Sequence, residues 1–269
     1  MMDFSKPKKP VQDHFKKQKD PLFVASMEKA IRVMEAFKHA DQGDMSLSEI
    51  VAKTGLDKSA AQRFLHTWQT LGYLEKNLTT KRFRLTAKNL NLSYEYLRAN
   101  KLIEIATPHM VEARNRTKHT FNLSVLDDID IVYVVRVPNH LQVLKATLLG
   151  RRLTAVFTSG GRAILSRLPD GTVADIIERS PLVARTPFTI TDPVKIMHEI
   201  EQARRKGYAI AAQESLIGEI AVAVPVVNAS GEPIAALHIP TNINQWPHKR
   251  VVDQLVPIAL ETAHAISPQ

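Results

Sequence analysis

The sequence contains no cysteine among its 269 residues. This absence excludes disulfide bridges, thiolate zinc sites and cysteine nucleophiles, and it suits a reducing compartment. No apolar run reaches the roughly 18 residues that a membrane-spanning helix needs. The lysine-rich N-terminal segment also lacks the apolar stretch of a secretory signal. We therefore expect a cytoplasmic protein without a transmembrane segment.

Signatures of common enzyme classes are missing as well. The sequence has no Gly-x-Ser-x-Gly elbow and no Walker loop. His198 and Glu199 begin a metalloprotease-like motif, but Gln202 stands where the second histidine is required. The ten histidines are scattered without metal-ligand spacing. We predict that the protein is not an enzyme and binds no cofactor or metal ion.

What is present begins with an uneven distribution of charge. With 44% hydrophobic and 23% charged residues, the composition is that of a globular protein, and the length allows one or two domains. Residues 1–100 hold 18 Lys and Arg against 11 Asp and Glu, whereas residues 101–269 hold 18 against 16. This excess favours a polyanionic partner for the N-terminal third. A basic surface that only keeps the protein dissolved explains it equally well.

Residues 1–21 form a predicted basic, disordered tail. Its lysines are Lys6, Lys8, Lys9, Lys16, Lys17 and Lys19. Such a tail can be an arm for DNA or a solvated extension.

From Phe23 the apolar spacing becomes helical, with Ser26 as the expected N-cap. Ile31, Met34 and Phe37 fall on one face, with Met27 and Ala30 a turn before them.

Two further helices are predicted on either side of a tight turn. The first spans about 47–53, with Ser46 as N-cap and Glu49 at the capping-box position. The second spans about 58–71 after Asp57, and two short strands at 73–76 and 82–85 follow as a hairpin. This order is that of a winged helix-turn-helix, in which the glycine turn lets the later helix enter a major groove. Trihelical modules that bind proteins share much of the same order.

Several polar residues lie at the start or on the exposed face of the third helix: Lys58, Ser59, Gln62, Arg63 and His66. Gln and Arg side chains can make bidentate contacts to base edges, and short polar side chains can bind phosphates. The hairpin adds Lys81, Arg82 and Arg84 as a charged wing. Any exposed helix face is polar, so the DNA-binding prediction depends on the turn and the charge excess.

The remainder of the chain is predicted as a helical linker over 87–105 and an α+β domain over 106–269, with a mainly antiparallel sheet. Pro108 marks a point where a helix is expected to restart. The predicted strands are 121–126, 129–135, 142–148, 221–227 and 234–239. The predicted helices are 161–167, 173–179, 193–206 and 250–265.

Two features of this domain suggest a ligand site. The stretch 158–163 opens a helix, where backbone N–H groups and the helix dipole favour an anion, although it is also an ordinary helix start. Gln213, Glu214, Glu219 and His238 come from neighbouring elements and can converge on one pocket. A histidine at a strand end is also often structural.

Several ordered motifs resemble the IclR family of bacterial regulators. They are Ser26–Phe37, Leu47–Leu65, Leu71–Leu74, Asp130–Val137, Gly150–Leu153, Ser159–Ala163 and Arg205–Tyr208. The resemblance covers nearly all of residues 22–266. It implies a winged helix-turn-helix domain over 22–86, a linker helix and a GAF-like effector domain. It further implies dimers that pair into tetramers and bind double-stranded DNA at a palindromic operator. The opening Asp20–Ser26 resembles the branch that governs aromatic-acid breakdown.

The resemblance also implies a set of effector-binding positions. They are Ser159, Gly160, Ala211, Glu219, Ala221, His238 and Pro240. Ala211 replaces a common acidic residue and His238 a usual small hydroxyl residue, so the smallest hydrophilic acids of the family are not the expected ligands. We expect His238 and the backbone at Ser159 and Gly160 to receive a carboxylate on a ring. Glu219, if it faces inward, opposes such a carboxylate.

Two other classes stay open on the sequence alone. One is a ligand-binding enzyme whose N-terminal module binds proteins. The other is an architectural DNA binder without a ligand, which requires a C-terminal domain with a filled core.

Overall fold

The computed structural model describes residues 21–40, 43–139 and 149–267. The chain divides into two compact units, residues 1–96 and 97–269, and this division falls inside the predicted linker. The predicted tail lies outside the described residues except for Pro21, and so does the predicted strand 142–148.

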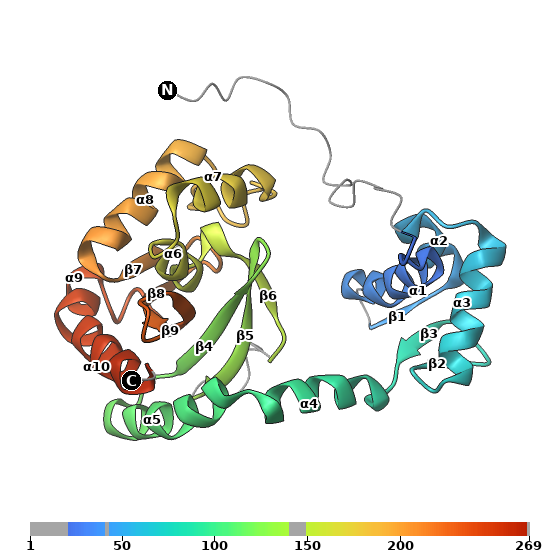
Figure 1. Cartoon of the computed structure of the whole chain (residues 1–269), viewed down its shortest axis with the longest axis horizontal. Helices are drawn as coiled ribbons and strands as arrows, with labels where there is room; N and C mark the ends of the chain where they lie inside the picture. Colours follow the sequence, from blue (N-terminus) through green and yellow to red (C-terminus); the bar gives the residue numbers. More distant parts are fainter. Residues whose placement is uncertain (1–20, 41–42, 140–148, 268–269) are drawn as a thin grey trace. The chain divides into compact units, whose positions relative to one another are not determined.

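The N-terminal unit packs three helices against a small sheet (Figure 1). The helices are α1 (Ala25–Glu35), α2 (Leu47–Thr54) and α3 (Lys58–Thr70), and a 3-10 turn, Ala36–His39, follows α1. The strands are β1 (Asp44–Met45), β2 (Leu74–Lys76) and β3 (Phe83–Leu85), in the order β1-β3-β2. The helix-turn-helix and the hairpin are thus confirmed. Strand β1 was not predicted, because two residues are too short to show a pattern.

Local hydrogen bonds explain why α2 and α3 begin and end where they do. The Ser46 N–H donates to the Glu49 carboxylate at 2.7 Å and the Glu49 N–H donates to Ser46 Oγ, which completes the predicted capping box. Gly55 ends α2 with φ of 67°, a left-handed conformation that glycine adopts without strain. The Ala60 N–H donates to Asp57 Oδ1 at 2.8 Å and caps α3.

The predicted N-cap of α1 was wrong, because Val24 is the N-cap and Ser26 lies inside the helix. Of the predicted face, Phe37 is buried and Met34 packs against the core, whereas Ile31 is 47% exposed and Val33 is fully buried. Packing within the unit sets this orientation, because α1 lies against α3 and Trp68 Nε1 donates to the Ala30 carbonyl at 3.0 Å.

The helical stretch that follows is interrupted at Asn100. It comprises α4 (Leu90–Ala99) and α5 (Lys101–Thr117), and the Asn100 side chain accepts from the Leu102 N–H to cap α5. Pro108 lies inside α5, so the predicted restart at this residue was wrong. The Asn100 cap supplies the helix start that the proline was expected to supply.

The C-terminal unit contains a six-stranded sheet in the order β6-β5-β4-β9-β8-β7, with antiparallel pairing throughout. Its strands are β4 (Phe121–Asp127), β5 (Asp130–Val137), β6 (Arg152–Thr154), β7 (Ala209–Ala212), β8 (Glu219–Val227) and β9 (Pro233–Asn242). This confirms the α+β class. Strand β7 was missed because its alanines carry little strand propensity.

Helices cover both faces of this sheet (Figure 1). One face packs on α5 and on α10 (Val256–Ile266), which follows α9 (His248–Arg250) and a π-helical turn, Val251–Leu255. The other face packs on α6 (Ser159–Leu165), α7 (Asp170–Arg179) and α8 (Pro193–Lys206).

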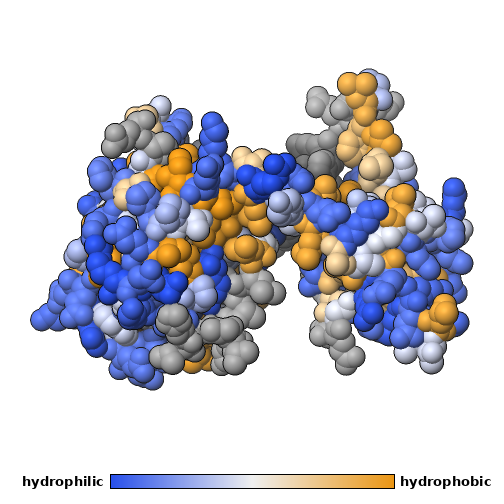
Figure 2. All heavy atoms as spheres, turned by 90° about the horizontal axis from the view of Figure 1, so that it is seen from below, coloured by the Kyte–Doolittle hydropathy of each residue, from blue (hydrophilic) through white to orange (hydrophobic). Residues whose placement is uncertain are grey.

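Apolar side chains also gather at the surface of both units, where Figure 2 shows them in orange among polar neighbours. In α4 the exposed apolar residues are Leu90, Leu92, Tyr94 and Tyr96, and in α1 they include Met27 and Ile31. Over the described part of the chain, no helix combines the length and apolarity needed to cross a membrane.

Candidate nucleic-acid interface and effector cavity

Helix α3 separates a buried face from a polar one. Ala61 and Leu65 are buried in the core of the N-terminal unit. The five residues predicted to read DNA are all exposed: Lys58, Ser59, Gln62, Arg63 and His66. They offer two cationic groups, an amide, a hydroxyl and an imidazole on the helix that follows the glycine turn.

The three predicted wing residues differ in their surroundings. Arg82 Nε donates to Asp44 Oδ1 at 2.5 Å, and Arg82 Nη2 pairs with Glu49 at 2.9 Å. Hydrogen bonds from the Ser46 backbone and hydroxyl, together with Arg82, lower the pKa of Glu49 to about 2. Arg84 pairs with Glu75, whereas Lys81 is exposed with φ of 59°. Internal carboxylates therefore balance the charges of Arg82 and Arg84.

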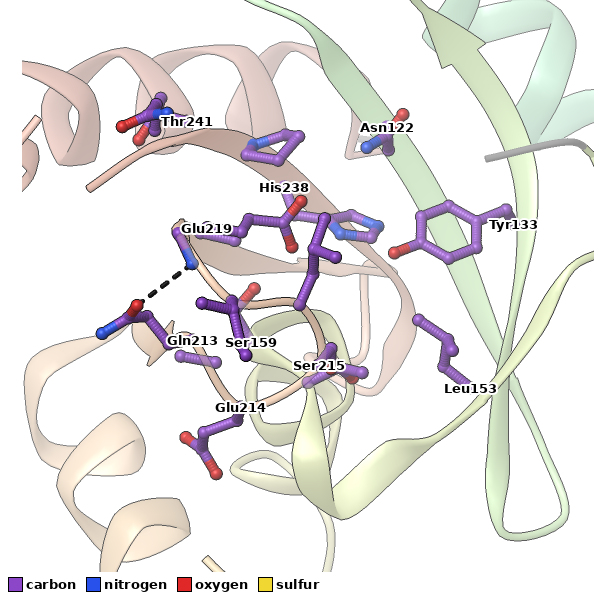
Figure 3. Close-up of a pocket in the computed structure, with 18 of the residues that line it drawn as sticks. Asn122, Tyr133, Leu153, Ser159, Gln213, Glu214, Ser215, Glu219, His238 and Thr241 are labelled. Atoms are coloured by element: carbon purple, nitrogen blue, oxygen red, sulfur yellow. Dashed lines mark hydrogen bonds between the residues drawn. The ribbon is translucent and has the colours of Figure 1, made fainter. Parts of the chain in front are cut away.

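A cavity of about 710 Å³ lies in the C-terminal unit, beside α6 and the sheet (Figure 3). Of the seven predicted effector positions, six line it: Ser159, Ala211, Glu219, Ala221, His238 and Pro240. Gln213 and Glu214 line it too, so the predicted convergence of Gln213, Glu214, Glu219 and His238 on one pocket is confirmed.

Strand register explains how distant residues meet at this cavity. Asn122 pairs with His238, and Ala221 with Pro240 and Ala211, so their side chains share one face of the sheet. A register shift at Leu123 and Ser124 interrupts the alternation along β5. This shift lets Tyr133 and Arg136, three residues apart, both reach the cavity.

Gly160 is buried beside the cavity rather than among its lining residues. A Cβ at this position would lie 3.1 Å from Ser124 Oγ and 3.4 Å from His238 Cε1. Glycine therefore permits the close approach of α6 to the sheet.

The anion site predicted at the start of α6 stays a prediction. Thr158 and Ser159 line the cavity, whereas Gly160 and Gly161 are buried beside it. The Gly161 N–H donates to Thr158 Oγ1 at 3.0 Å, so this backbone donor of the helix start is already bonded within the chain.

His238 and Tyr133 form an uncharged polar side of the cavity. Their rings are stacked with centroids 5.0 Å apart, and they face each other in Figure 3. Burial lowers the pKa of His238 to about 3 and, with Glu219, raises the pKa of Tyr133 to about 12. Among the described residues, the buried His238 Nε2 and Ser124 Oγ have no hydrogen-bond partner.

Four charged side chains also line the cavity: Arg136, Arg151, Glu214 and Glu219. Burial raises the pKa of Glu219, while Arg151 and Arg136 oppose that shift. Glu219 thus faces the cavity, where it opposes an acidic ligand, but Arg136 and Arg151 line the cavity with it. Sequence reasoning missed Tyr133 and both arginines. Regular alternation along β5 could have indicated which of its side chains face the cavity, but the register shift between β4 and β5 breaks that alternation.

With Arg136 and Arg151 in its lining, the cavity can bind a small anionic molecule. In the described residues, no group of three His, Cys, Asp or Glu side chains is placed to hold a metal ion. The volume is that of a typical small-molecule pocket.

Comparisons with known proteins match both units of the chain. Residues 26–78 match the model of the IclR helix-turn-helix domain, and residues 94–268 match that of the bacterial transcriptional regulator IclR C-terminal domain. The chain is 32% identical over 249 residues to the p-hydroxybenzoate hydroxylase transcriptional activator of Acinetobacter baylyi, covering 91% of each chain. It is 29% identical to the Pca regulon regulatory protein of Pseudomonas putida, covering 93% of this chain and 85% of that one.

A solved structure shows the same architecture. It is an IclR homologue from Microbacterium hydrocarbonoxydans complexed with 4-hydroxybenzoate, with 25% identity and a TM-score of 0.72, covering 90% of this chain and 97% of that one. The matched families and relatives are transcriptional regulators and not enzymes. With both family models matched in order, the chain belongs to the IclR family of DNA-binding, effector-responsive bacterial transcriptional regulators.

Proposed function

We propose that the chain senses an aromatic carboxylic acid of a catabolic pathway and adjusts its binding to a palindromic operator in response. The observation that carries this proposal is the cavity, where Arg136 and Arg151 stand near an uncharged His238 and Tyr133. The arginines suit a carboxylate, and the stacked rings suit an aromatic face. The names of two relatives, a p-hydroxybenzoate hydroxylase activator and a Pca regulon regulator, support this class of effector.

This proposal moves the carboxylate away from the position expected from the sequence. A neutral His238 supplies no positive charge, whereas Arg136 and Arg151 at the cavity do. The cavity also argues against an architectural DNA binder, which requires a filled C-terminal core.

On the DNA side, the exposed residues of α3 read the major groove, and Lys81 contacts the backbone from the wing. Helices over 87–105 form the linker, and the protein acts in the cytoplasm as a dimer or tetramer. The exposed apolar residues of α1 and α4 support self-association. Effector binding changes the geometry or assembly of the subunits and so alters how two recognition helices meet half-sites about 34 Å apart.

The test is binding of the full chain to its own upstream DNA across a salt series, with and without 4-hydroxybenzoate and related aromatic acids. We expect specific binding that weakens with salt and shifts with one acid. Specific DNA binding that no acid shifts would contradict the effector class. No specific binding at all would favour a protein-interaction role for the N-terminal unit.

A further inference from the structure

One ion pair of the C-terminal unit is almost completely shielded from water. Arg162 Nη1 and Nη2 donate to Glu214 Oε1 and Oε2 at 2.6 and 2.7 Å, and the two side chains are 1% and 5% exposed. The pair between Arg116 and Glu261 in the same unit is 50% and 61% exposed. Burying two charges is costly unless both are well bonded, so a purely stabilising role is a weak explanation.

The pair joins two walls of the cavity. Arg162 belongs to α6, whose first residue Ser159 lines the cavity, and Arg162 Nε donates to the Val156 carbonyl at 2.9 Å. Glu214 begins the segment 214–218, whose residues also line the cavity. The Ile190 N–H donates to Glu214 Oε2 at 3.2 Å, which ties the segment to the chain before α8.

The pair also decides which charges the cavity presents. Figure 3 shows the Glu214 carboxylate pointing away from His238 and Tyr133, on the side where it meets Arg162. The Glu219 carboxylate, in contrast, lies near His238 in Figure 3, and the charges of Arg136 and Arg151 act on it. Without Arg162, a second carboxylate charge would act on the cavity from a poorly solvated site.

We propose that the Arg162–Glu214 pair determines ligand charge specificity: it fixes segment 214–218 as a wall and cancels the charge of Glu214, so that the cavity favours an anion over its neutral analogue. This inference rests on the proposed function. Arg162 and Glu214 act as positioning residues, since their charged groups bind each other.

The experiment compares 4-hydroxybenzoate with 4-hydroxybenzamide, which keeps the ring and replaces the carboxylate by a neutral amide. Calorimetric binding at pH 8 to the full chain gives an acid-to-amide affinity ratio for each variant. We expect Arg162→Met to lower this ratio roughly tenfold, since an unpaired buried carboxylate repels the acid. Glu214→Gln should keep or raise the ratio, and the double variant R162M/E214M should restore it. Arg116→Met, which breaks the exposed pair, should leave it unchanged.

Equal loss of acid and amide affinity in Arg162→Met would show a merely structural role and overturn the inference. If that variant does not fold, a ratio lowered by Glu214→Gln would overturn it as well.

Amide hydrogen exchange tests the positioning role without any ligand. In Glu214→Gln, amides of segment 214–218 should exchange faster while those of β8 and β9 do not, and unchanged exchange in the segment would contradict the positioning role. Failure of the wild type to bind either probe would instead count against the proposed effector class.

Discussion

At the scale of single residues, burial gives the cavity its chemistry. His238 packs against Tyr133 and close to Gly160, and its imidazole is kept neutral by its surroundings. Arg63, in contrast, is exposed to solvent on the polar face of α3, where its guanidinium can contact DNA.

Replacing Arg63 by alanine should weaken operator binding by roughly tenfold, the cost of one lost base or phosphate contact. Effector binding should not change, because Arg63 lies in the other unit. Fluorescence anisotropy with labelled operator DNA measures the loss. Lys29→Ala in α1 removes the same charge as a control, and an Arg63→Ala affinity equal to that of the control would disprove the recognition-helix assignment.

Gly160→Ala should weaken effector binding by about 1 kcal/mol or more, because the added methyl group crowds Ser124 and His238. Gly171→Ala in α7 is the matched control, since a Cβ there meets nothing within 4 Å. Calorimetric titration with 4-hydroxybenzoate compares the two. Similar affinities for both variants would mean that crowding of Ser124 and His238 does not reach the ligand.

The buried histidine also predicts a pH dependence of stability. Because the folded pKa of His238 is lowered from 6.5 to about 3, the unfolded chain takes up a proton first as the pH falls. The free energy of unfolding should therefore decrease below pH 6.5, by at most about 1.4 kcal/mol per pH unit from this residue. Denaturant titrations between pH 5 and 7 measure this decrease, which His238→Gln should flatten. The control is His248→Gln, at an exposed histidine, and it should leave the decrease as it is.

At the scale of elements, caps and register place the functional residues. The capping box of α2 and the Gly55 turn set the start of α3, and the shift between β4 and β5 brings Tyr133 and Arg136 to one cavity.

Ser46→Ala should lower the stability of the N-terminal unit by about 1 kcal/mol, because two hydrogen bonds of the α2 cap are lost. Ser48→Ala, an exposed change inside the same helix, should be neutral or slightly stabilising. Thermal unfolding of the two variants provides the comparison. Equal stabilities would show that Glu49 and Arg82 hold this terminus without Ser46.

At the scale of the whole molecule, assembly is expected to link the two sites. A regulator that reads two half-sites needs two copies of α3, and α4 carries exposed apolar residues between the DNA-reading and sensing parts of the chain.

Leu92→Glu should reduce self-association and, with it, operator affinity, since Leu92 is 71% exposed on α4. Asn91→Glu introduces the same charge on the neighbouring residue and should have a smaller effect. Sedimentation velocity over a concentration series measures the assembly. A wild type that stays monomeric, or a Leu92→Glu variant that assembles normally, would contradict this role for α4.

The local features of this protein follow from short stretches of its sequence. The capping residues Ser46, Asp57 and Gly55 act through hydrogen bonds and dihedral angles within a few residues, so their patterns specify α2, the turn and α3 without distant contacts. The family motifs further indicated which class of ligand domain follows.

Which distant side chains meet depends on the packing of the whole fold. The orientation of α1, the burial of the α6 terminus and the grouping of Arg136, Arg151 and Tyr133 depend on packing and strand register. The pairing of Arg162 with Glu214 joins residues 52 positions apart. Such contacts depend on burial, charge and hydrogen bonding across the whole fold. A periodic pattern within one segment therefore does not specify them.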